Sequence, residues 1–465
     1  MGGLQETSAD RPAAAPSPDP AALLRSRQYL ALVVFAAVLG VPLSAAAFGF
    51  LKLVSLSQGW VFTDIPKALG FHGEPVWWPV PPLALGGVLV ALTIRYLPGK
   101  GGHSPADGFK AHGAPAPGEL PGVFLAALAT LAFGAVLGPE APLIALGGGL
   151  AAWAVKLAKH DAPAQATAVI ATAGSFAAIG TLLGSPLLGA FLLMEIVGLG
   201  GGMLSVVLLP GLLASGIGAL IFTGLGTWTG FGTFSLAIPQ LPHFARPDAA
   251  DFGWALAIGV GAAVVGTGIH RLGLFLRPHV ERWLLLGVPA AGLAVAGLAV
   301  AYAEGAGKPT SDVLFSGQTA VGPLVDHAAS YTVGALLLLL ACKALAYGVS
   351  LSGFRGGPVF PSLFIGAAGG ILLSHLPGLA LVPGVAMGIG AMCAAMLRLP
   401  LTSVLLATLL LLSDGLAVMP VVIVAVVVAH LVTAQLSPAP AQEPAGSPAR
   451  EPAATRLRTT QEGIR

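Results

Sequence analysis

The chain has 465 residues, of which 55% are hydrophobic and only 9% are charged, and its mean hydropathy is +0.87. Soluble domains carry about 25% charged residues, so this composition excludes an ordinary soluble protein and indicates a membrane protein. The net charge is +2, and no basic stripe with interleaved aromatic residues predicts a nucleic-acid partner. We therefore expect an all-α polytopic membrane protein that contacts lipid and binds no nucleic acid.

Ten apolar segments approach the ~20 residues that a membrane-spanning helix needs. They are Tyr29–Val54, Val80–Leu97, Gly122–Leu137, Ala164–Leu183, Met203–Leu225, Phe252–Phe275, Trp283–Tyr302, Thr332–Ser350, Leu379–Leu397 and Val418–Leu436. No cleavable signal pattern accompanies the first of them, and Arg25 and Arg27 just before it place the N-terminus in the cytoplasm by the positive-inside bias. The sequence thus predicts a multi-pass protein of the inner or plasma membrane.

The two ends of the chain differ in composition from the middle. Residues 1–28 and 437–465 are rich in proline, alanine and charge, which predicts disordered tails, the first of them cytoplasmic, and no regulatory domain. Residues 29–436 between them form the predicted membrane domain. Cys342 and Cys393 lie in apolar segments and fit neither a disulfide framework nor a metal site. No metal and no cofactor is expected.

Glycine and proline interrupt many of the apolar runs. Broken helices are tolerated inside a bilayer only where the freed backbone groups face protein or a water-filled cavity, so the breaks indicate an interior path. The breaks also repeat along the chain. Gly138–Pro142 is followed by Gly147, and Gly357–Pro361 is followed by Gly366 at the same spacing.

A second pair of positions agrees with this repeat. Gly174 lies twelve residues before Pro186, and Gly388 lies twelve residues before Pro400. The predicted halves cover about residues 30–225 and 250–436. Duplicated halves with interrupted helices at matching positions predict a binding site between the repeats near the middle of the membrane. The alternative is that glycine-rich membrane helices look alike by chance.

Glu140 is a lone carboxylate inside the first break, where the sequence reads GPEAP. A helix that begins at Pro139 or Pro358 leaves its first N–H groups without partners, and its dipole places about half a positive charge at that end. Two such ends that converge make an anion site. Glu140 can then occupy the anion position and open the path when it is protonated or displaced. The alternative is a glutamate that only complements the helix dipole.

These motifs resemble those of the CLC chloride channels and chloride/proton exchangers over about Tyr29–Leu436. GPEAP is similar to the family's G-[KR]-E-[GA]-P, with Glu140 at the external gating glutamate. GGHSP at 101–105 is similar to GSGIP, and GGPVFP at 356–361 is similar to GG-x-F-x-P with Val359 in place of the phenylalanine. LLGSPLLGAFLLMEI and MLRLPLTSVLLATLL resemble the P-L-x-G helices that follow each anion helix.

The resemblance implies a homodimer in which each subunit has its own anion path between two inverted-topology halves. It also implies that chloride or another small anion is the substrate and that Glu140 is the external gate. The anion-binding residues that it implies are Gly101, Gly102, His103, Ser104, Gly138, Ala141, Gly357, Val359 and Phe360.

The sequence departs from the family pattern at positions that would hold the anion. Pro139 and Pro358 each remove a backbone N–H, Gly102 stands where a serine hydroxyl is usual, and no tyrosine follows the last span. Each charge-assisted hydrogen bond is worth roughly 1.5–3 kcal/mol, so weaker or less selective anion binding is predicted. His103 or Ser104 can supply substitute donors. A fluoride exporter is an alternative, although that branch usually carries methionine at the serine position.

A second glutamate, Glu195, aligns with an acidic residue near the family's subunit interface, and Leu409 is its counterpart in the second half. Ile196 falls where the exchangers place an internal proton-transfer glutamate, and an apolar residue there is typical of the channels. We therefore predict channel-like or poorly proton-coupled transport, with Glu195 in a structural role between helices. Anion/proton antiport stays open, because water can still reach Glu140 from inside.

Two other classes of function are weighed against anion conduction. A secondary carrier of organic anions would also use inverted repeats and helix N-termini. A membrane enzyme would need a serine–histidine, paired-aspartate or histidine–glutamate metal constellation on neighbouring helices. The sequence contains no HExxH or GxSxG motif, and Asp414 stands alone. We therefore expect a transport protein and not an enzyme.

Overall fold

The computed structural model describes residues 20–109, 113–198, 202–230, 244, 246–411 and 414–437. In these residues the regular structure is helical, apart from one β-bridge between Gly138 and Gly357. Residues 1–19 and 438–465 of the predicted tails lie outside the described residues. Pro20–Leu24 forms a short helix, α1, within the predicted first tail.

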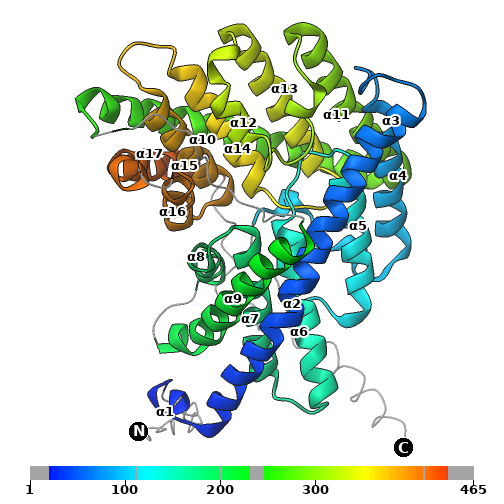
Figure 1. Cartoon of the computed structure of the whole chain (residues 1–465), viewed down its shortest axis with the longest axis vertical. Helices are drawn as coiled ribbons and strands as arrows, with labels where there is room; N and C mark the ends of the chain where they lie inside the picture. The colour runs from blue at the N-terminus through cyan, green and yellow to red at the C-terminus, as the bar shows by residue number, and fades with distance from the viewer. Residues whose placement is uncertain are drawn as a thin grey trace, which may run out of the picture.

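The helices follow one another in two groups that correspond to the predicted halves. The first group is α1, α2 (Arg27–Gly59), α3 (Ile65–Ala68), α4 (Val80–Tyr96), α5 (Leu120–Ala132), α6 (Glu140–Ala158), α7 (Ala164–Leu182), α8 (Pro186–Val197) and α9 (Gly202–Thr229). The second group is α10 (Ala249–Arg282), α11 (Leu284–Ala306), α12 (Val321–Asp326), α13 (Val333–Leu351), α14 (Val359–Leu373), α15 (Leu381–Leu397), α16 (Pro400–Leu410) and α17 (Gly415–Leu436). In Figure 1 the first group, blue to green, runs along the bottom and right, and the second group, green to orange, lies mainly at the top and left.

Seven helices of the described chain are long and apolar enough to cross a membrane. Six of them contain segments that the sequence predicted as spans, and the seventh is α6. The other four predicted segments form the shorter apolar helices α4, α5, α7 and α15. The largest difference is at the predicted span Gly122–Leu137, where α5 ends at Ala132 because the backbone leaves helical geometry at Gly134, with φ +99°.

The glycines of the repeat bring equivalent helix pairs into close contact. A Cβ added to Gly147 of α6 would lie 2.6 Å from the carbonyl oxygen of Gly174 in α7. A Cβ added to Gly366 of α14 would lie 2.3 Å from the carbonyl oxygen of Gly388 in α15. Small residues let membrane helices approach backbone to backbone, and both halves use the same device at matching positions. The repeat in the sequence is therefore a repeat of helix packing.

The most deeply buried helices belong to the second half. Nearly every residue of α15 is buried, and so are most residues of α14, which packs directly against it. α15 also packs against α17 and α10. This buried position fixes the first residues of α14, and they form one side of the site described below.

Candidate functional site

The two halves of the chain are joined where α6 and α14 begin. The Gly138 N–H donates to the carbonyl oxygen of Gly357 at 2.8 Å, and the Gly357 N–H donates to the carbonyl oxygen of Gly138 at 2.7 Å. Pro139 and Pro358 are the N-cap residues of the two helices. The sequence predicted that the helices begin at these prolines, one residue earlier than they do. The breaks of the two halves thus meet each other directly.

Glu140, the first residue of α6, is fully buried at this junction. Its Oε1 accepts a hydrogen bond from the backbone N–H of Val359, the first residue of α14, and the N–H of Phe360 also faces the carboxylate. Its Oε2 is buried and has no partner among the described residues. A carboxylate from one half therefore caps the positive end of a helix from the other half.

Two glycines make the space that the Glu140 carboxylate occupies. A Cβ added to Gly138 would lie 2.0 Å from Oε2, and a Cβ added to Gly357 would lie 2.4 Å from Cδ. Neither glycine has a positive φ, so the close approach of the carboxylate, and not the backbone conformation, requires glycine here.

Of the predicted site residues, those around the Glu140 carboxylate are Gly138, Gly357, Val359 and Phe360. Ala141 follows Glu140 in α6 and is partly exposed. The structure thus brings the two helix starts together, as the repeat predicted. The loop at residues 101–105 packs against Arg355, two residues before Gly357.

The GGHSP stretch forms the loop between α4 and α5. Gly101 and Gly102 have φ values of +70° and +88°, a region that favours glycine. Ser104 is buried, and its hydroxyl has no hydrogen-bond partner within the described part of the chain. His103 is exposed. Of the two substitute donors considered from the sequence, Ser104 is the one that faces the interior without a protein partner.

Arg355 connects this loop to the junction of the halves. A Cβ added to Gly101 would lie 3.6 Å from the Cγ of Arg355, and Arg355 is two residues before Gly357. The Arg355 backbone N–H donates to the hydroxyl of Thr130 in α5 at 3.0 Å. Our sequence reading missed Arg355, although the signal that drew attention to Glu140, a lone charge in an apolar glycine-rich stretch, applies to it equally.

Tyr347 of α13 is a second residue that the sequence reading missed. It is fully buried, and its hydroxyl donates to the carbonyl oxygen of Pro358 at 3.2 Å. The Ser362 hydroxyl donates to the same oxygen at 2.6 Å. The family pattern has a tyrosine after the last span, whereas Tyr347 lies in the predicted span Thr332–Ser350. A tyrosine in an apolar span is the signal that could have identified it, because a buried tyrosine hydroxyl usually needs a polar partner.

Glu195 is hydrogen-bonded between helices, as the sequence predicted. Its Oε1 accepts from the Leu401 N–H at 2.9 Å, and its Oε2 accepts from the N–H and the hydroxyl of Thr402 at 2.8 and 2.6 Å. Glu195 of α8 therefore caps the first turn of α16. Ile196, the next residue, is partly buried against the hydrophobic core.

An apolar cavity lies apart from the junction, and the described residues hold no metal site. An apolar cavity of about 640 Å³ lies between α2, α5 and α6, with Phe50, Phe124 and Trp153 in its lining and no charged residue. It does not include Glu140 or the loop at 101–105. No group of three or more His, Cys, Asp or Glu in the described residues could hold a metal ion.

Comparison with known proteins identifies the family. Residues 86–434 match the model of the voltage gated chloride channel family. This chain belongs to the CLC family. A CLC-family chain is a multi-pass membrane protein that transports anions and is not an enzyme. The curated relative named "Putative ion-transport protein YfeO", from Salmonella schwarzengrund, is 30% identical over 353 residues, which cover 75% of this chain and 82% of the relative.

Solved CLC structures share this fold. A slow cyanobacterial Cl⁻/H⁺ antiporter matches with a TM-score of 0.72 and 19% identity, covering 87% of this chain and 94% of the antiporter chain. A CLC-type fluoride/proton antiporter matches with a TM-score of 0.60 and 20% identity, covering 87% of this chain and 95% of its own. These identities establish the fold, so the transported ion and its coupling are argued below from this chain's residues.

Proposed function

We propose that the chain conducts small inorganic anions, chloride first among them, along a path gated by the Glu140 carboxylate. The observation that carries this proposal is the burial of that carboxylate at the start of α14, where it accepts the Val359 N–H while its second oxygen has no protein partner. The N-terminus of a helix is an anion site, because its first N–H groups are free and its dipole is positive there. A side-chain carboxylate at that place competes with a mobile anion for the same donors.

Protonation releases the gate. The charge-assisted hydrogen bond to Val359 is worth roughly 1.5–3 kcal/mol, and a neutral carboxyl group keeps only about half of that, so it leaves more easily. A mobile anion then takes the N–H groups of Val359 and Phe360 in place of the carboxylate. Anion flux is therefore expected to rise as the external pH falls.

The test is chloride efflux from liposomes that contain the purified protein, measured at several external pH values. Glu140→Gln, which cannot carry the charge, is expected to conduct at neutral pH with weakened pH dependence. Glu304→Gln, which removes an exposed carboxylate of α11, is the matched control and is expected to behave as the unsubstituted protein. A folded Glu140→Gln protein with full pH dependence would place the gate elsewhere. Vesicles that retain chloride, bromide, nitrate and fluoride as well as empty ones do would refute anion conduction altogether.

Transport through this path is proposed to be channel-like or poorly coupled to protons. An internal proton relay needs an ionisable group or a water wire across much of the ~30 Å hydrocarbon layer. Ile196 cannot hold a proton, and the side-chain oxygens of the neighbouring Glu195 accept hydrogen bonds from the start of α16. A chloride gradient imposed on the liposomes is therefore expected to drive little proton movement.

Anion/proton antiport is the second candidate, because chains with this fold include a Cl⁻/H⁺ antiporter and a fluoride/proton antiporter. Uphill proton movement at a fixed ratio to chloride, abolished by Glu140→Gln, would favour it. A carrier of organic anions is the third, and uptake of a carboxylate substrate without any halide flux would favour that class.

A further inference from the structure

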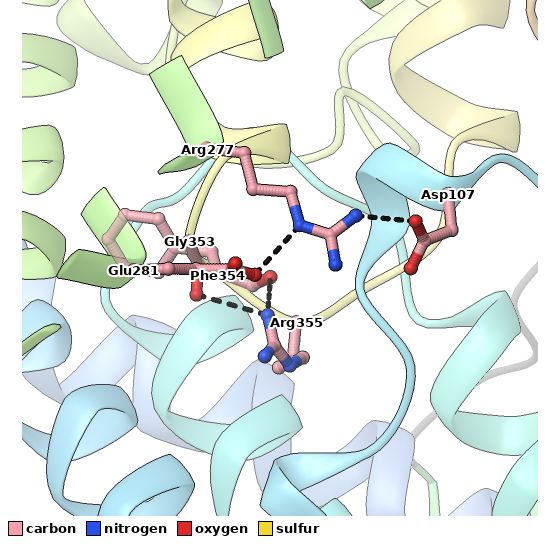
Figure 2. A network of polar contacts seen from close by, with 6 residues as sticks. All are labelled: Asp107, Arg277, Glu281, Gly353, Phe354 and Arg355. Carbon is pink, nitrogen blue, oxygen red and sulfur yellow. Dashed lines mark hydrogen bonds and ion pairs between the residues drawn. The ribbon is translucent and has the colours of Figure 1, made fainter. Parts of the chain in front are cut away.

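Two arginines and two carboxylates gather where the end of α10, the loop after α4 and the segment before α14 meet (Figure 2). Arg277 of α10 binds both carboxylates: Nη1 donates to Asp107, and Nε donates to Oε1 of Glu281 at 2.7 Å. Arg355 makes no ion pair with any carboxylate that the structure describes. The cluster therefore contains one arginine that has no carboxylate partner.

Only one nitrogen of the Arg355 guanidinium group, Nη1, donates hydrogen bonds to described residues. Its Nη1 donates to the carbonyl oxygens of Gly353 and Phe354 at 3.3 and 3.2 Å, as Figure 2 shows. Its Nε is buried and has no hydrogen-bond partner in the described chain. A guanidinium carries five N–H donors, and the N–H groups of Nε and Nη2 form the parallel fork that binds an oxyanion with two bonds. This fork is the edge that the protein leaves unused.

A second buried donor without a partner lies in the adjoining loop. The Ser104 hydroxyl is buried and unpaired among the described residues, three positions after Gly101, which packs against the Arg355 side chain. Buried polar groups are nearly always hydrogen-bonded, so two unsatisfied donors in segments that pack together call for an acceptor that the described residues do not provide. Because one of the donors is a cation, that acceptor is an anion.

The location of the cluster suits an entry point to the path. Lys100 and Arg282, which adjoin Gly101 and Glu281 in the sequence, are exposed, and such basic residues mark the cytoplasmic side by the positive-inside bias. The Arg355 side chain as a whole is partly exposed, whereas its Nε is buried. An anion from the cytoplasm can therefore reach this guanidinium before it meets the junction at Gly357.

We propose that Arg355 is an anion ligand at the cytoplasmic mouth of the path, where its Nε/Nη2 edge and the Ser104 hydroxyl bind one small monovalent anion. This inference rests on the proposed function and deepens it: the cation supplies the donors that Gly102 and Pro358 lack. A forked pair of N–H donors favours a planar oxyanion such as nitrate over a spherical halide. The protein thus has two anion positions in series, one at Arg355 and one that the Glu140 carboxylate fills.

The test is titration calorimetry of chloride and nitrate into the purified protein at neutral pH, where Glu140 covers the position at Val359. Arg355→Gln is expected to weaken the binding of both anions by about tenfold or more, as expected for loss of a charge-assisted hydrogen bond. Arg355→Lys keeps the charge but loses the fork, so it is expected to weaken nitrate more than chloride. Arg282→Gln, which removes a nearby exposed charge, is the control and is expected to bind as the unsubstituted protein does.

Unchanged affinities in a folded Arg355→Gln protein would overturn the inference. If that variant does not fold, an unchanged nitrate-to-chloride affinity ratio in Arg355→Lys would overturn it instead. The flux assay separates this failure from failure of the proposed function. Unsubstituted protein that moves anions, together with Arg355 variants that bind them normally, refutes only the role of Arg355. Unsubstituted protein that moves no anion refutes conduction, whatever the calorimetry shows.

Discussion

Glu140 can lie at the junction of the halves only because glycine precedes both helices there. Its carboxylate occupies the volume that a Cβ of Gly138 or Gly357 would take. The backbone at both glycines is compatible with alanine, since neither φ is positive. A methyl group at either position is therefore expected to displace the Glu140 carboxylate, the proposed gate, and to leave the fold intact.

We predict that Gly357→Ala pushes the Glu140 carboxylate out of its site. The added Cβ would lie 2.4 Å from Cδ, and the glutamate side chain can swing away while the backbone cannot. Chloride efflux should then resemble that of Glu140→Gln, with raised flux at neutral pH and weakened pH dependence. Gly369→Ala, at a glycine of α14 with nothing within 4 Å of an added Cβ, is the control. Full pH dependence in Gly357→Ala would contradict this account.

Single residues were predictable where their own neighbours in the sequence carried the signal. Glu140 stood out because it interrupts a run of apolar and small residues between two prolines. Arg355 carries the same local signal, but its lack of a carboxylate partner depends on Asp107 and Glu281, which come from distant segments and both bind Arg277. No local pattern can show that a charge has been left without a partner by residues far along the chain.

The α8–α16 contact depends on one carboxylate. Glu195 accepts three hydrogen bonds from the first turn of α16, two of them from backbone N–H groups. We predict that Glu195→Gln lowers the stability of the protein by about 1–2 kcal/mol, because the amide loses the charge that complements the helix dipole and part of this cap. A lower thermal unfolding midpoint in detergent is the measurement.

Glu304→Gln, an exposed substitution on α11, serves as the control for the loss of one negative charge. The structural role also predicts that Glu195→Gln leaves the small proton flux unchanged. Unaltered stability together with a loss of proton movement would instead assign Glu195 to proton transfer.

α14 and α15 approach each other closely at Gly366 and Gly388. Gly366→Ala would place a Cβ 2.3 Å from the carbonyl oxygen of Gly388, so the two helices must separate. Overpacking of this kind costs about 1–3 kcal/mol. We expect a lower unfolding midpoint for Gly366→Ala than for Gly369→Ala, whose added methyl group meets open space in the same helix. Equal midpoints for the two variants would show that the contact is not tight.

Helices were predictable as apolar segments, whereas their ends were not. Each of the ten predicted segments falls on a helix, yet Gly122–Leu137 loses its last residues to a non-helical turn. Ala135, Val136 and Leu137 are fully buried there without being helical. Hydropathy reports burial from water and not backbone geometry, so it cannot separate a spanning helix from a buried, irregular segment inside a membrane protein.

Large apolar side chains remain exposed on the two helices that Glu195 links. Leu187 of α8 and Leu401 and Leu409 of α16 are exposed in the single chain. Lipid tails or a second subunit can cover such a face, and CLC membership favours a second copy. We predict a homodimer in detergent, with twice the 46.4 kDa mass of one chain. Light scattering or cross-linking in membranes that finds only single chains would refute it.

Each chain already contains its own junction of α6 and α14, so anion flux should scale with the number of subunits.

The duplication of the chain was predictable from four spaced glycine and proline motifs, because close helix packing and helix breaks require these residue types. The way the halves are fastened together was not readable. The two hydrogen bonds between Gly138 and Gly357 join main-chain groups, which every residue except proline offers. Their existence depends on three-dimensional convergence alone.

The hydrogen-bonded bridge between Gly138 and Gly357 limits how the two halves can move. Transporters built from repeats commonly rock one half against the other, which requires the halves to slide at their common centre. Here a reciprocal pair of main-chain hydrogen bonds joins the halves at their centre, adjacent to the proposed gate, Glu140. We therefore expect opening by rotation of side chains, a process of picoseconds to nanoseconds for free rotamers, against microseconds to milliseconds for collective motions of domains. A spectroscopic label on each half should report a constant separation throughout the transport cycle.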